Sequence, residues 1–239
     1  MLKDTIFDEK LNLEDFYMPF SKNTIDFLIE NHLNDSKVWY QEHKENYKQY
    51  IAEPFSEFIT ALQPTINEID SEIVCNPKRF SRLYRDTRFS KGGSIFRDNM
   101  WCSFERKTEQ FKSVPSFYFD ISPNGFEYGC GYYMASTATM NILRELILKN
   151  DKAFQAAINS YESQNTFQLA GDLYKKNHYP EQSERICNWL NRKSIYLFCK
   201  SADMDVFCSD KLSDMITEDY KKIAPIYHLF MKVGEFSIC

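Results

Sequence analysis

The cysteines of this 239-residue chain are not arranged for metal or disulfide chemistry. There are seven of them, an odd number, and no two have the CxxC spacing. We therefore expect neither a disulfide framework nor a zinc ribbon, and the pattern is typical of a reducing cytoplasm. No stretch approaches the run of about 20 apolar residues that a membrane helix requires. The first residues interleave charged and apolar side chains, which is unlike a secretory signal.

Motifs for common cofactors and nucleophiles are also missing. No GxSxG, P-loop or GxGxxG sequence occurs. The sequence therefore does not indicate acyl transfer, binding of a nucleoside triphosphate or binding of a dinucleotide. The scattered histidines have none of the spacings that place two metal ligands on one helix face. We predict no cofactor and no metal site. With no linker or repeat, we expect one domain over residues 1–239, in which residues 1–23 are a candidate flexible or loosely packed segment.

Hydrophobic residues make up 43% of the chain and aromatic residues 16%, which is enough to fill a sizeable core. Short segments in the middle alternate apolar and polar residues with period two, and these predict strands at FSRLYR, MWCSFER, PSFYFDIS, FEYGCGYY and, later, SIYLFC. Pro123, Asn124 and Gly125 predict a tight turn that joins two of them in an antiparallel hairpin. Gly129 and Gly131 indicate a bulge or a close backbone approach.

Helical periodicity dominates the rest of the sequence. Asp35 and Ser36 offer an N-cap for a helix that continues to about Ile51. A second helix begins near Pro54 and is expected to close at Pro64. Further stripes follow Thr137, an Asp151 cap and Pro180, and a last one precedes Pro225. The order predicts the α+β class, with a central antiparallel sheet flanked by helices.

A cationic segment stands out against the net charge of −5. Residues 78–97 contain seven basic residues and one acid, Asp86. The rest of the chain is strongly acidic and would repel a long polyanion, so nucleic acid is an unfavoured partner and a small anionic ligand is favoured. We expect a loop after Asp86 that aims its cations at one point. The candidate ligand-binding residues are Arg82, Arg85, Asp86, Arg88, Lys91 and Arg97.

Other interpretations of this segment remain open. The same residues suit a structural ion network, or a non-enzymatic surface that contacts an acidic partner or RNA. Asp120, in the predicted hairpin, is a weak candidate for a general base if it faces the cationic loop. Cys130 is expected to be a buried structural thiol rather than a nucleophile.

The heptapeptide RDTRFSK at residues 85–91 resembles the signature of the domain-of-unknown-function family 2461. Residues 39–44 (WYQEHK), residues 117–123 (FYFDISP) and Lys193-Ser194 are similar to further family features in the same order. Where the family continues DKSPYKT, this chain has GGSIFRD at residues 92–98, so an acid and a proline are absent and Arg97 replaces a lysine. The resemblance implies a single-domain protein and supplies no catalytic residues.

Overall fold

A computed structural model of the protein describes residues 20–86, 93–108 and 114–238. Its centre is a five-stranded sheet in the order β1-β2-β3-β5-β4, in which every neighbouring pair is antiparallel. The α+β class with a central antiparallel sheet is therefore confirmed. The strands are β1 (Met100–Phe104), β2 (Ser116–Ser122), β3 (Gly125–Gly131), β4 (Gln168–Ala170) and β5 (Tyr196–Ser201). The short edge strand β4 was not predicted from the sequence.

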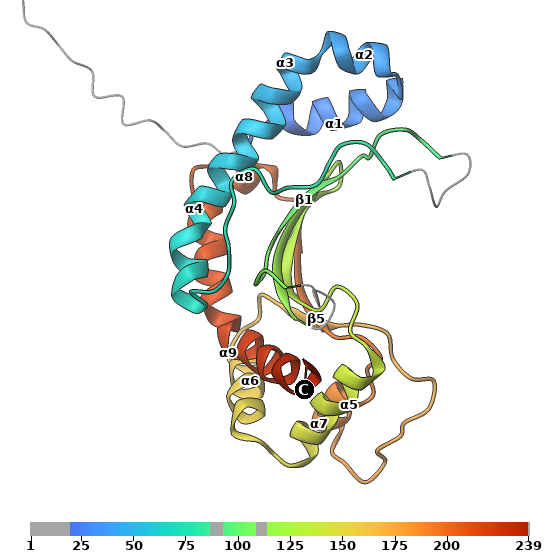
Figure 1. Cartoon of the computed structure of the whole chain (residues 1–239), viewed down its shortest axis with the longest axis vertical. Helices are drawn as coiled ribbons and strands as arrows, with labels where there is room; N and C mark the ends of the chain where they lie inside the picture. The colour runs from blue at the N-terminus through green and yellow to red at the C-terminus, as the bar shows by residue number, and fades with distance from the viewer. Residues whose placement is uncertain (1–19, 87–92, 109–113, 239) are drawn as a thin grey trace, which may run out of the picture.

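The helices precede, follow and separate these strands, and the two long ones, α4 and α9, lie along the same side of the sheet (Figure 1). Among the residues that the structure describes, no helix is long and apolar enough to cross a membrane. The helices are α1 (Lys22–Asn34), α2 (Lys37–Glu42), α3 (Lys44–Tyr47), the π-helical turn η1 (Lys48–Ala52), α4 (Glu53–Ile69), α5 (Thr137–Leu148), α6 (Lys152–Glu162), α7 (Glu184–Leu190), α8 (Met204–Phe207) and α9 (Leu212–Ile238).

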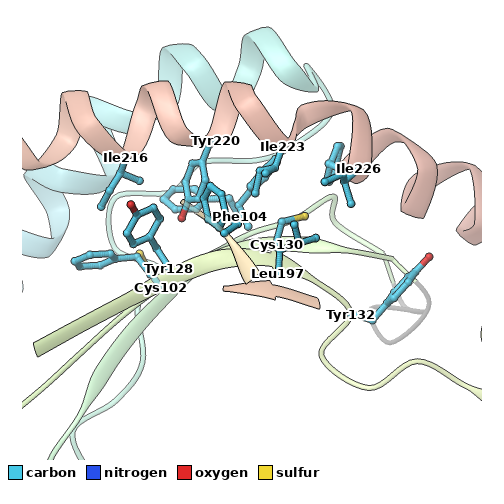
Figure 2. Packing of buried hydrophobic residues seen from close by; sticks show 14 of the residues in the cluster. Cys102, Phe104, Tyr128, Cys130, Tyr132, Leu197, Ile216, Tyr220, Ile223 and Ile226 are labelled. Atoms are coloured by element: carbon cyan, nitrogen blue, oxygen red, sulfur yellow. The ribbon is translucent and has the colours of Figure 1, made fainter. Parts of the chain in front are cut away.

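The core lies between the sheet and α9. Burial alternates along β2, so Phe117, Phe119 and Ile121 point to the helices while the intervening side chains point away. Figure 2 shows Tyr220 and Ile223 of α9 directed at the sheet. The Tyr220 hydroxyl also donates a 2.7 Å hydrogen bond to the carbonyl of Tyr118, which satisfies its polar atom inside an apolar layer. One face of the sheet is therefore committed to the core.

Both long helices continue through a proline, contrary to the prediction that they end there. Pro64 lies inside α4 and Pro225 lies inside α9. A proline inside a helix costs about 3 kcal/mol. The buried side chains beyond it, Ile66 in α4 and Leu229 and Phe230 in α9, each contribute about 1.5–3 kcal/mol on burial, which is comparable to that cost in α4 and larger than it in α9. Tertiary packing therefore overrides the local signal.

The junction of α1 and α2 differs from the predicted cap. Asp35 ends α1 in the left-handed conformation, with φ 45°, instead of starting the next helix. Ser36 alone caps α2, and its hydroxyl accepts a hydrogen bond from the Trp39 N–H at 3.3 Å. Ahead of α1, Phe20 is buried in the core. The remainder of the candidate N-terminal segment, residues 1–19, lies outside the described residues.

The glycines of the hairpin behave as predicted. Gly125 closes the turn with φ 115°. A Cβ on Gly129 would lie 1.9 Å from the Leu197 carbonyl oxygen, and one on Gly131 would lie 2.3 Å from the Tyr196 Cβ. The close approach of β3 and β5 therefore requires glycine at both positions.

The cationic segment forms two paired arms rather than the predicted strand at residues 80–85. Its described residues make only single bridges, Phe80 to Cys102 and Tyr84 to Phe96. The Arg85 N–H donates to the Ile95 carbonyl at 2.9 Å, and the Arg97 N–H donates to the Leu83 carbonyl at 2.8 Å. Asp35 explains why the ladder does not extend, because its carboxylate accepts the N–H groups of Ile95 and Phe96 at 2.7 and 3.1 Å.

Candidate functional site

A cleft lies on the face of the sheet that points away from α4 and α9. Its volume is 720 Å³. The alternation that sends Phe119 into the core sends Tyr118 and Asp120 into this cleft, where Trp101 of β1, Glu127 of β3 and Tyr196 of β5 join them. We call it the sheet-face cleft. In Figure 1 this side of the sheet carries no helix layer in the described part of the chain.

The cationic segment lines two smaller hollows beside this cleft, with volumes of 570 and 330 Å³. Both are lined by Arg85, Asp86 and Arg97, and Arg82 joins the larger one. Asn99 lines the smaller hollow and the sheet-face cleft, while Trp101 lines the larger hollow and the same cleft. The hollows and the cleft are therefore neighbours that share walls. We call the two hollows together the arginine pocket.

Arg97 of the arginine pocket contacts an aromatic side chain. Its guanidinium carbon lies 4.5 Å from the centre of the Trp101 ring, a cation–π contact. Its Nε is buried and has no hydrogen-bond partner among the described residues. The Trp101 ring therefore positions this guanidinium through a contact with its face. Such a contact does not use the guanidinium N–H groups, whereas an ion pair with a carboxylate would use them.

Arg82 and Arg85 reach the same pocket because the segment is not a regular strand. Strand geometry would place residues three apart on opposite faces. Here both line the larger hollow. Arg85 comes within 3.9 Å of Asp98. Both side chains are substantially exposed, so this ion pair contributes little to the stability of the fold. The other two predicted cations, Arg88 and Lys91, lie outside the described residues.

Asp120 lies in the sheet-face cleft beside the arginine pocket. Asn99 donates a hydrogen bond of 2.7 Å to its Oδ2, and Asn99 itself lines the smaller hollow. The pKa of Asp120 is raised to about 6, mainly by burial. The negative charges of Glu127 and Asp98 also act to raise this pKa, whereas the Asn99 hydrogen bond acts to lower it. A carboxyl group that titrates near neutral pH can accept or donate a proton under physiological conditions.

Glu127 also lines the sheet-face cleft, and it was not among the candidate residues predicted from the sequence. It lies directly opposite Asp120 across the β2–β3 hairpin, and the Tyr118 hydroxyl donates to its Oε1 at 2.9 Å. Burial raises the pKa of Tyr118 well above its usual value, with Glu127 as the next cause, so the phenol remains a donor. The signal was present, because the turn at residues 123–125 fixes the register that pairs residue 120 with residue 127.

Cys130 is the thiol that the sequence analysis singled out. Cys130 is fully buried on the core face of β3, and burial raises its pKa, so it is a structural thiol, as predicted. Within the described residues, no three His, Cys, Asp or Glu side chains gather in a way that could hold a metal ion.

These features describe an α+β protein whose antiparallel sheet is covered by helices on one face and carries polar, aromatic and cationic groups on the other. The family model described as "Conserved hypothetical protein (DUF2461)" matches residues 23–229, most of the chain. The chain therefore belongs to this family, as the RDTRFSK heptapeptide indicated. No curated protein matches the chain significantly. The family description specifies no activity, so a functional proposal depends on the geometry of the site.

Proposed function

We propose that the protein binds a small anionic molecule, bearing a phosphate or a carboxylate, in the arginine pocket. The observation that carries this proposal is the state of Arg97, whose guanidinium lies over Trp101 with a buried Nε that lacks a partner among the described residues. Arg82 and Arg85 line the same pocket from the opposite arm of the segment. Three guanidinium groups face one aspartate, Asp86, and planar guanidinium groups match the paired oxygens of such anions.

The neighbouring Asp120 extends the proposal to catalysis. When Arg85 and Arg97 hold the anionic group of a ligand, the rest of that ligand lies near Asn99. This residue lines both the smaller hollow and the sheet-face cleft. Asp120 accepts its hydrogen bond from that same Asn99. A carboxyl group with a pKa of about 6 is suited to remove or supply a proton on the bound molecule. We infer a cytoplasmic location, which the free thiols in the described part of the chain support.

Calorimetric titration with inorganic phosphate and with succinate tests the anion site. We expect wild type to bind at least one of them. Because a hydrogen bond to a charged group is worth about 1.5–3 kcal/mol, Arg97→Ala should lose about 10- to 100-fold in affinity. Arg97→Lys should recover part of the loss, since it keeps the charge but not the planar fork. The matched control is Arg185→Ala, because Arg185 forms an ion pair with Glu162 away from the pocket.

A second candidate is a purely structural role for the cationic segment. The hydrogen bonds that Asp35 accepts from Ser94, Ile95 and Phe96 of this segment favour it. That role predicts a lower melting temperature for Arg97→Ala and no binding of either anion to wild type. An Arg97→Ala variant that binds anions as tightly as wild type would overturn the proposed pocket. Binding only to RNA or to an acidic protein, with a steep dependence on salt, would instead indicate an interaction surface.

A further inference from the structure

The sheet-face cleft has features that binding of a simple anion does not require. Its walls include Tyr118, Tyr133 and Tyr196 among four tyrosines, and its polar groups include Ser103 and Ser116. Tyr133 is 80% exposed, an unusual state for so large a side chain. Aromatic faces and hydroxyl groups together suit a ligand with an apolar ring face and polar edges.

The middle strand of the cleft carries no side chain beside Tyr196. Gly131 lies opposite Ser116 on one side and Tyr196 on the other, so β3 contributes no side chain at that level. A Cβ on Gly131 would lie 2.3 Å from the Tyr196 Cβ, so the Tyr196 side chain occupies part of the space beside β3. At this level the cleft is therefore bounded by an aromatic side chain on β5 and by a serine on β2.

The charge of the cleft selects which part of a ligand enters it. Asp120 and Glu127 lie side by side, each engaged by one described donor, from Asn99 and Tyr118. A carboxylate has about four lone-pair sites, so each can accept further hydrogen bonds. These two acids disfavour a phosphate or carboxylate in the cleft and favour groups that donate, such as the hydroxyls of a sugar.

We propose that the ligand is a phosphorylated sugar, with its phosphate in the arginine pocket and its ring in the sheet-face cleft, where its hydroxyls donate to Asp120 and Glu127. This inference rests on the anion site proposed above. A phosphate monoester carries close to two negative charges at neutral pH. The three arginines that line the larger hollow outnumber the one aspartate that lines it, Asp86, so the pocket favours a ligand of negative charge. The shared walls of Asn99 and Trp101 place the two halves of the ligand next to each other.

Titration of wild type with four probes separates the two parts of the site. The probes are inorganic phosphate, butyl phosphate, ribose 5-phosphate and glucose 6-phosphate. We expect at least one sugar phosphate to bind 10-fold or more tightly than butyl phosphate, which has the phosphate but no hydroxyls. If inorganic phosphate binds and neither sugar phosphate exceeds butyl phosphate, the sugar inference is wrong and the anion site stands. If no probe binds, the sugar inference is wrong, and if succinate does not bind either, the anion site fails as well.

Two variants assign any gain to the cleft. Glu127→Gln should remove most of the 10-fold advantage of the sugar phosphate and leave the affinity for butyl phosphate unchanged or slightly higher, because a negative charge near the anion is lost. Tyr196→Ala should also reduce the advantage by removing one wall. Glu145→Gln, on the exposed surface of α5, is the control. Equal losses for both ligands in Glu127→Gln, or an undiminished advantage in both cleft variants, would overturn the inference.

Discussion

Asp120→Asn should make the protein more stable, and increasingly so as the pH rises. In the folded protein, burial raises the pKa of Asp120 from 3.8 to about 6. A raised folded-state pKa means that protonation favours the folded form. The contribution is fully present below the unfolded pKa near 3.8 and is lost as the pH rises through about 6. Asparagine has nearly the shape of the protonated carboxyl group and has no charge to lose.

The size of the effect follows from these two pKa values. Ionisation of Asp120 costs the folded state about 1.6 kcal/mol at pH 5 and about 3 kcal/mol at pH 8, relative to the protonated group. The advantage of Asp120→Asn over wild type should therefore grow by about 1.4 kcal/mol between these pH values. In a chain of this length that corresponds to a further separation of about 3–6 °C in melting temperature.

Urea unfolding of wild type and Asp120→Asn at several pH values measures this difference directly. All other titrating groups are common to both proteins. Their contributions to the pH dependence of the free energy of unfolding therefore cancel to first order in the difference. The control is Glu162→Gln on the exposed surface of α6, because the hydrogen bond from Arg185 lowers the pKa of Glu162, so the difference from wild type should not change over the same range. A constant difference between wild type and Asp120→Asn from pH 5 to pH 8 would refute the raised pKa, and with it the case for proton transfer by this residue.

Three further substitutions test the packing that supports the site. Asp70→Ala should cost about 3 kcal/mol in urea unfolding, because the buried Asp70 carboxylate accepts hydrogen bonds from Arg106, at 2.7 Å, and from Tyr227; a loss below about 1 kcal/mol would contradict this. Gly129→Ala should cost about 1–3 kcal/mol or prevent folding, because its Cβ would lie 1.9 Å from the Leu197 carbonyl oxygen, and wild-type stability would argue against the close strand approach. Pro64→Ala should raise the melting temperature, since it restores a helix donor inside α4 at an exposed position; a lower melting temperature would show that the proline is needed.

The sequence was informative where local and tertiary preferences agree. The turn residues at 123–125 identify the β2–β3 hairpin, and the Asp151 cap marks the start of α6, where its carboxylate accepts the Ala153 N–H at 2.8 Å. Prediction failed where distant contacts outweigh the local signal. Pro64 and Pro225 do not end their helices because the residues beyond them are buried. The three-residue strand β4 is too short to show a period.

The candidate site was predictable only in part. Charge density identified the cationic segment, and the alternating pattern of β2 singled out Asp120. The pairing of Arg97 with Trp101 was not accessible, because it depends on how the second arm of the segment folds back beside β1. Asp35 sets that path from a remote position in the chain, between α1 and α2. Contacts of this kind require the tertiary structure.

The measurement closest to the central claim is an NMR titration that follows the arginine Nε–H signals as inorganic phosphate is added. The Arg97 signal is assigned by its absence in Arg97→Lys. If the arginine pocket is an anion site, the Arg97 signal should shift with phosphate and saturate, while that of Arg185, paired with Glu162 on the surface, should stay in place. An Arg97 signal that moves no more than that of Arg185, in this titration and in a parallel one with succinate, would contradict the proposal that this pocket binds an anion.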